Sequence, residues 1–102
     1  MISVLIQFTL PQPMPADKMA EISLGNAPMY KDMPGLVRKY YVRSEDGIRV
    51  GGMYLWESRE AAEATYDDAW RTRVTETYGS PPEMTWFDTP VVVDNRAGEI
   101  VS

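Results

Sequence analysis

The chain opens with alternating apolar and polar positions, which is the period of a β-strand with one buried face. The apolar positions of this predicted strand are Ile2, Val4, Ile6, Phe8 and Leu10. Three prolines follow, and the spacing of apolar residues over 16–24 then favours a helix. Because Gly25, Asn26 and Pro28 interrupt that spacing, we expect a kink there, or a break with Asn26 capping a second short helix.

Two segments rich in aromatic and β-branched residues, 36–43 and 50–56, predict a β-hairpin. Between them lies Asp46-Gly47, a pair that tight hairpin turns prefer. A two-residue turn there predicts the cross-strand pairs Tyr41 with Gly52, Lys39 with Tyr54, and Val37 with Trp56. One face of the hairpin then carries Lys39, Tyr41, Tyr54 and Trp56. The other carries Leu36, Arg38, Tyr40, Val42, Met53 and Leu55. This second face is more aliphatic, and we expect it to be the one that faces the helices.

The second half of the chain predicts one long helix and a final strand. Ser58 is a good N-cap, and the apolar spacing continues to about Tyr78, with Gly79 just past the end. On the opposite, solvated face, Glu63, Asp67 and Arg71 stand four apart, a spacing that favours ion pairs. Residues 84–93 then form a strand, and Pro90 within it implies a sheet edge or a bulge.

The element order is therefore βαββαβ, which predicts an α+β, ferredoxin-like fold: a four-stranded antiparallel sheet with both helices on one face. We expect a single domain over 1–94 and a C-terminal tail over 95–102. The central hairpin is aromatic on both faces, so neither face resembles a purely solvated surface. A second copy packing sheet against sheet would cover the remaining face, and the sequence therefore predicts a homodimer.

Composition narrows the possible chemistry. Lys and Arg number 10 against 15 Asp and Glu, giving a net charge of −5, and the basic residues are scattered, which argues against nucleic acid as a partner. No segment predicts a membrane helix or a cleaved leader, so we expect no membrane partner and a cytoplasmic location. Cysteine and histidine are both absent. Disulfides, thiol nucleophiles, histidine bases, Cys/His zinc sites and histidine-ligated haem are thus excluded.

Several segments together resemble the YdhR-like monooxygenase family, in the dimeric α+β barrel superfamily. The residues that carry the likeness are Pro34-Gly35-Leu36, Lys39, Tyr41, Gly51-Gly52-Met53-Tyr54-Leu55-Trp56 and Phe87-Asp88. The sequence departs from the family pattern at Arg38, where an aromatic residue is frequent, and at Pro28. The resemblance implies a homodimer, a pocket between sheet and helices, and an oxygenase activity with no cofactor and no metal.

The leading hypothesis is a cofactor-independent monooxygenase acting on a small aromatic, phenolic or hydroquinone-type substrate. Lys39 would generate or stabilise the phenolate while Tyr41 and Tyr54 orient it. The predicted substrate-binding residues are Arg38, Gly52, Trp56, Trp70 and Trp86. Each candidate has a simpler explanation: the lysine stem covers apolar surface, the aromatic side chains fill a core or an interface, Arg38 solvates the surface, and Gly52 makes room for Tyr41 across the strand. The alternative is a non-catalytic dimeric module that binds a small ligand or serves as a structural partner.

Overall fold

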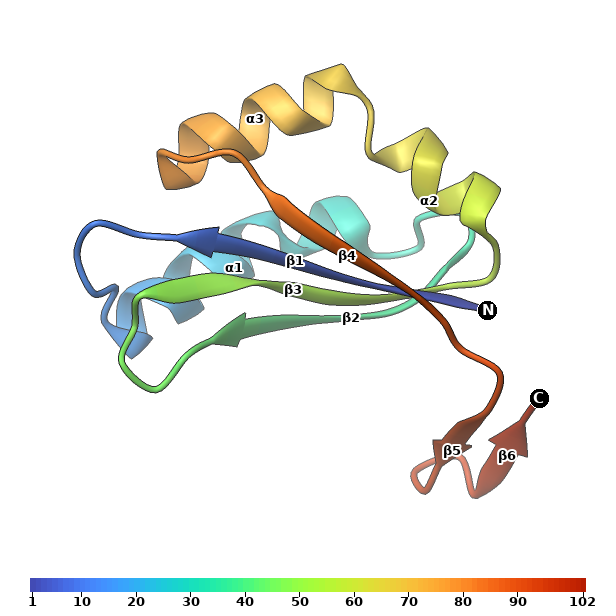
Figure 1. The fold of residues 1–102 in the computed structure, drawn as a ribbon. Helices are drawn as coiled ribbons and strands as arrows, with labels where there is room; N and C mark the ends of the chain where they lie inside the picture. Colours follow the sequence, from blue (N-terminus) through green and yellow to red (C-terminus); the bar gives the residue numbers. More distant parts are fainter.

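The structure, a computed structural model, describes residues 1–102 and has the predicted ferredoxin-like α+β fold (Figure 1). Its elements are β1 (Ile2–Thr9), α1 (Ala16–Tyr30), β2 (Leu36–Arg43), β3 (Arg49–Trp56), α2 (Arg59–Thr65), α3 (Asp68–Tyr78), β4 (Glu83–Asp88), β5 (Val92–Asp94) and β6 (Glu99–Val101). The first four strands form an antiparallel sheet in the order β2-β3-β1-β4, and β5 and β6 form a separate hairpin. None of the helices combines the length and apolar character that crossing a bilayer requires.

Strand β1 lies inside the sheet, between β3 and β4, as its alternating pattern indicates. Val4, Ile6 and Phe8 are almost completely buried beneath the helices. Cross-strand neighbours share a face of the sheet, so the residues of β3 that pair with Val4, Ile6 and Phe8 also point toward the helices. Val4 pairs with Tyr54, and Ile6 pairs with Gly52.

Helix α1 is one continuous helix, so of the two expected alternatives the break, with Asn26 capping a second short helix, is wrong. Pro28 lies inside the helix and removes one backbone hydrogen bond, the bond that would reach back to the carbonyl of Leu24. Leu24 is 74% exposed, so its side of the helix faces water. At the end of the helix, the side chain of Tyr30 is buried in the core and anchors the last turn. Packing of that turn therefore outweighs the local preference for a break.

The hairpin register is confirmed over most of its length, with Tyr41 opposite Gly52 and Lys39 opposite Tyr54. The predicted two-residue turn is wrong, because Ser44 N donates to the carbonyl of Arg49 and closes a longer loop. The predicted cross-strand pairs are still correct, because the predicted two-residue turn and the observed longer loop are both centred on Asp46-Gly47. At the other end, a β-bulge between Leu36 and Arg38 places Leu36, instead of Val37, opposite Trp56.

The predicted orientation of the hairpin is also wrong. The face that packs against the helices is the one with Tyr54 and Trp56, which are 5% and 0% exposed. The pairing of Val4 with Tyr54 requires this, because Val4 is buried beneath the helices. The opposite face, which we call the open sheet face, carries Tyr40, Met53, Leu55 and Phe87. Tyr40, Met53 and Phe87 are about half exposed.

The predicted long helix is divided into α2 and α3 at Tyr66-Asp67. Asp67 leaves helical geometry and accepts a hydrogen bond from Trp70 N at 2.8 Å, so it is the N-cap of α3. Asp67 is consequently not part of a charged row on one helix face, and Glu63 pairs instead with Arg59 at 2.8 Å. The break rotates α3 so that Trp70 is buried against the sheet.

The outer ends of these two helices are as predicted. Ser58 accepts a hydrogen bond from Ala61 N at the start of α2, and Gly79 ends α3 with a left-handed φ of 76°.

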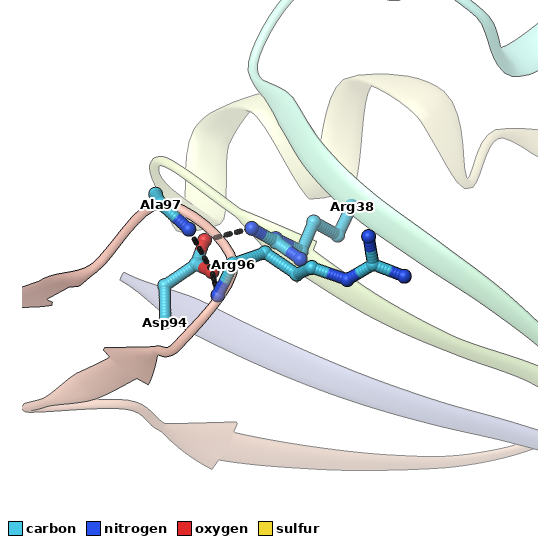
Figure 2. A network of polar contacts seen from close by, with 4 residues as sticks. All are labelled: Arg38, Asp94, Arg96 and Ala97. Carbon is cyan, nitrogen blue, oxygen red and sulfur yellow. Dashed lines mark hydrogen bonds and ion pairs between the residues drawn. The ribbon is translucent and has the colours of Figure 1, made fainter.

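The final strand is shorter than predicted. Strand β4 ends at Asp88, and the chain then leaves the sheet through Pro90. The expected tail over 95–102 contains β6, which pairs with β5 as a small hairpin. Figure 2 shows how this hairpin is tied to β2: the Asp94 carboxylate accepts hydrogen bonds from the Arg38 guanidinium and from the backbone of the turn that follows it.

Candidate active site

A cavity of about 80 Å³ lies between the sheet and the helices α1 and α3. It is lined by residues from every layer of the fold: Ile6, Phe8, Asn26, Met29, Tyr30, Lys39, Tyr41, Gly51, Gly52, Tyr54, Trp70, Arg73, Val74, Thr77 and Tyr78. Most of these side chains are aromatic or aliphatic, and the polar groups are few. An apolar pocket with a few convergent polar groups is the usual form of a small-molecule site.

Lys39 brings an amine into this cavity from β2. Its Nζ atom lies 3.4 Å from the ring centre of Tyr30, 3.9 Å from that of Tyr41 and 4.6 Å from that of Tyr54. No carboxylate pairs with it, since the ion pairs of the structure involve other basic residues. Burial, and secondarily the charge of Arg73, lower the pKa of Lys39 to about 7.

A second cation reaches the cavity from α3. Arg73 donates a hydrogen bond to the hydroxyl of Tyr30 at 3.2 Å, and the same oxygen accepts one from Trp70 Nε1 at 3.1 Å. Tyr30 therefore joins the two helices above the amine of Lys39. The sequence interpretation missed Tyr30, because it lies beyond the expected helix break. The signal for Arg73 was present, since this charged residue occupies the apolar face of its predicted helix.

The rings of Tyr41 and Tyr54 both lie next to Lys39 Nζ, on the hairpin face that the predicted register has them share. The Tyr41 hydroxyl donates to Asn26 Oδ1, which ties β2 to α1. Tyr54 packs edge-on against Tyr30, with 6.0 Å between ring centres. Burial, together with neighbouring tyrosines, raises the pKa of both hydroxyls above the ordinary value of 10.0. Both side chains therefore keep their protons at neutral pH and can donate hydrogen bonds.

Gly52 keeps the floor of the cavity open. A Cβ atom at this position would lie 2.9 Å from Tyr54 Cε1 and 3.3 Å from Lys39 Cε. The first distance is shorter than a van der Waals contact, so a side chain here would displace the two residues that define the site. The absence of a side chain at Gly52 thus has a structural reason that belongs to this cavity.

The remaining predicted binding residues lie outside the cavity. Trp56 is completely buried behind it and donates its Nε1 hydrogen to Tyr66 Oη at 3.0 Å. Trp86, on β4, packs edge-on against Tyr66 with 5.9 Å between ring centres. Arg38 points away from the helices and pairs with Asp94 (Figure 2). The structure thus gathers Lys39, Tyr41, Tyr54, Gly52 and Trp70 at one site and separates Trp56 and Trp86 from it, whereas Arg38 lies outside the cavity but lines the groove that adjoins it.

A wider surface groove adjoins the cavity beside α1 and β2. Its volume is about 380 Å³, and it shares Tyr30, Lys39 and Tyr41 with the cavity. The side chain of Lys39 therefore stands between an enclosed aromatic space and an open groove. A ligand larger than the cavity can reach the amine from this side.

The charge of the cavity is opposite to that of the whole chain. Its lining contains the two cations Lys39 and Arg73 and no carboxylate, although the chain has a net charge of −5. Unpaired positive charge with hydrogen-bond donors in a partly enclosed site favours an anionic ligand, or one that becomes anionic during a reaction.

Comparison with solved structures finds the same fold in several proteins, whereas no family model and no curated protein matches the chain. A monooxygenase from the gene ActVA-Orf6 of Streptomyces coelicolor, in complex with nanaomycin D, aligns with a TM-score of 0.66 and 21% identity, over 90% of this chain and 88% of that one. SnoaB, a cofactor-independent oxygenase from Streptomyces nogalater, gives 0.62 and 18%, over 86% and 91%. Rv0793 from Mycobacterium tuberculosis gives 0.61 and 20%, over 86% and 93%.

Proposed function

We propose that this chain is a cofactor-independent monooxygenase that oxidises a small phenol or hydroquinone. The observation that carries the proposal is the environment of Lys39: a lysine amine with a pKa of about 7, among three tyrosine rings, in a cavity with no carboxylate. Such an amine is partly neutral at neutral pH and can accept a proton, which an ordinary lysine cannot do there.

The first step follows from the charges of the site. Neutral Lys39 takes the proton of the substrate hydroxyl, and the phenolate that forms faces the new ammonium and the Arg73 guanidinium. Lys39 stabilises this anion the more strongly, because tyrosine rings surround its amine, and Arg73, which is exposed, adds a second positive charge at the edge of the site. Tyr54 remains protonated and orients the substrate oxygen as a hydrogen-bond donor, whereas Tyr41, whose proton is donated to Asn26 Oδ1, contributes its ring to the wall of the cavity.

The second step needs no cofactor because the substrate supplies all of the electrons. A ring carbon of the phenolate forms a bond to one oxygen atom of O₂, giving a hydroperoxide. Breaking the O–O bond with loss of the ring hydrogen leaves a quinone carbonyl, and the other oxygen atom departs as water. Phenol plus O₂ thus gives quinone plus water, with atoms and electrons balanced and the proton of Lys39 returned to the departing oxygen.

The size of the site restricts how the substrate binds. A cavity of about 150 Å³ accepts benzene, whereas the cavity beside Lys39 measures about 80 Å³. We infer that the substrate ring lies largely in the adjoining groove, with its hydroxyl directed toward the amine. The flexible stem of Lys39 and the side chain of Met29, which is half exposed, are the parts of the lining that move most easily to admit it.

The structural neighbours add support of a different kind. Two of them are described as a monooxygenase and a cofactor-independent oxygenase, and one of these holds nanaomycin D. The resemblance to the YdhR-like family points the same way. Fold likeness alone does not carry an activity, since one fold hosts many functions. The proposed activity of this chain therefore rests on Lys39 and the residues around it.

We also propose that the protein is a homodimer formed through the open sheet face. Tyr40, Met53 and Phe87 are 54%, 47% and 51% exposed there, and an apolar groove of about 370 Å³ runs beside them. A two-fold axis through this face would bury these side chains against the same side chains of the second copy. A two-fold dimer of this kind is the commonest closed assembly.

The activity is tested by oxygen uptake with a panel of phenols and hydroquinones. We expect uptake by the native protein and by Lys18→Met, whose lysine is exposed and lies away from the cavity and the groove, and a loss of about 100-fold in Lys39→Met, the low end of what a positioned acid or base contributes. Retained uptake in Lys39→Met would remove the assigned base. No uptake by the native protein with any substrate would favour a non-catalytic module that binds small ligands.

A further inference from the structure

The lysines of this chain fall into two chemical classes. Lys18 and Lys31 are exposed and pair with Glu21 at 3.7 Å and Asp32 at 2.9 Å. Lys39 has no carboxylate partner and is enclosed by aromatic rings. A lysine amine that is deprotonated in an apolar site is a nucleophile toward carbonyl groups, whereas an exposed, paired ammonium is not.

The cavity itself selects the size and charge of a carbonyl compound that reaches this amine. Its volume of about 80 Å³ corresponds to roughly three water molecules at about 30 Å³ each, so it holds only a few non-hydrogen atoms. The second cation, Arg73, also lines it and has no carboxylate partner. A guanidinium without a carboxylate partner can bind the carboxylate of a ligand in a planar, bidentate geometry.

We propose that Lys39 captures a small aldehyde that carries a carboxylate, of the size of glyoxylate, as a covalent Schiff base. The carboxylate binds Arg73, and the carbonyl carbon faces Lys39 Nζ. The amine adds to the carbonyl carbon, and the resulting carbinolamine loses water to give the imine, so no oxidant or reductant takes part. This chemistry does not require the oxygen reaction, although it uses the same lysine.

The neutral fraction of the amine supports the inference. With a pKa of about 7, about half of the Lys39 side chains are neutral at pH 7, compared with roughly one in a thousand or fewer for an ordinary lysine. The aromatic walls also limit the water that would hydrolyse the imine.

The test is a competition within the native protein. The protein is treated with glyoxylate and cyanoborohydride at about pH 7, which converts each imine to a carboxymethyl amine, and peptides are mapped by mass spectrometry. We expect Lys39 to be modified at least about 10-fold faster than Lys18 and Lys31, given its larger neutral fraction. Equal modification of the three lysines, or slower modification of Lys39, would overturn the proposal.

A variant separates carboxylate recognition from amine reactivity. In Arg73→Gln, we expect the modification of Lys39 by glyoxylate to fall several-fold relative to its modification by acetaldehyde, which has no carboxylate. Arg71→Gln, an exposed neighbour on α3, should leave this ratio unchanged. An unchanged ratio in Arg73→Gln would remove Arg73 as the anchor. Oxygen uptake is measured separately, so failure of aldehyde capture and failure of the oxygenase proposal remain distinguishable.

Discussion

Replacement of Lys39 by methionine should change how the stability of the protein depends on pH. The pKa of Lys39 is about 7 in the folded protein and 10.5 for an ordinary lysine. Between these values the unfolded chain binds one more proton than the folded chain does. The free energy of unfolding therefore rises as the pH increases from about 7 toward 10.5, and is lowest below 7, where folding buries an ammonium.

The size of the effect follows from the difference between the two pKa values. From 7 to 10.5 is 3.5 units, and each unit corresponds to about 1.36 kcal/mol, so the full effect approaches roughly 5 kcal/mol. Between pH 6 and pH 9, only about 2–3 kcal/mol of this appears, since Lys39 titrates partway through that window. The buried tyrosines do not contribute there, because their pKa values are raised and both states keep the protons.

Methionine retains most of the apolar stem and has no charge, so Lys39→Met should show no such slope. Its advantage over the native protein should be about 2–3 kcal/mol larger at pH 6 than at pH 9. The measurement is urea unfolding followed by tryptophan fluorescence at fixed protein concentration, because a dimer would make stability depend on concentration. Lys31→Met, with an exposed lysine, is the matched control and should keep the native slope.

A flat profile for the native protein would refute the reasoning. Each tyrosine ring near Nζ attracts the ammonium by roughly 0.5–2 kcal/mol, which opposes the cost of burying the charge. If the three rings together cancelled that cost, Lys39 would remain charged at neutral pH. The roles of Lys39 as a base and as a nucleophile would then fail together.

Three further substitutions test other parts of the structure. Gly52→Val should lower oxygen uptake at least about 10-fold while the protein stays folded by circular dichroism, because the new side chain enters the cavity; unchanged uptake would place the reaction elsewhere. Tyr66→Phe should lower the free energy of unfolding by about 1–3 kcal/mol in urea titrations, since the buried Nε1 of Trp56 loses its acceptor; a neutral effect would mean that another group accepts this hydrogen. Met53→Glu should give a monomer by sedimentation, whereas Leu24→Glu on exposed α1 should not; a dimer of Met53→Glu would exclude the open sheet face as the interface.

Local pattern alone was sufficient to predict the four strands of the main sheet and their order along the chain, but not the small hairpin of β5 and β6. The alternation in β1 and the turn residues around Gly47 act over a few neighbouring residues, and they predicted the pairing of Lys39 with Tyr54. Three of the site residues followed directly, because Lys39 and Tyr41 are two apart on one strand and Tyr54 lies across from Lys39. The N-cap at Ser58 was equally predictable from the sequence, since its hydrogen bond joins residues within one helical turn.

Which face of the hairpin meets the helices was decided only by the tertiary structure. Alternation tells which residues share a face, but not which face is covered, and the answer came from the pairing of Val4 with Tyr54. The same limit applies to the site. Tyr30 and Arg73 are 43 residues apart in sequence and meet only when α1 and α3 pack on one sheet. Their contact, and the lowered pKa of the lysine beneath them, arise from that packing and from no local pattern.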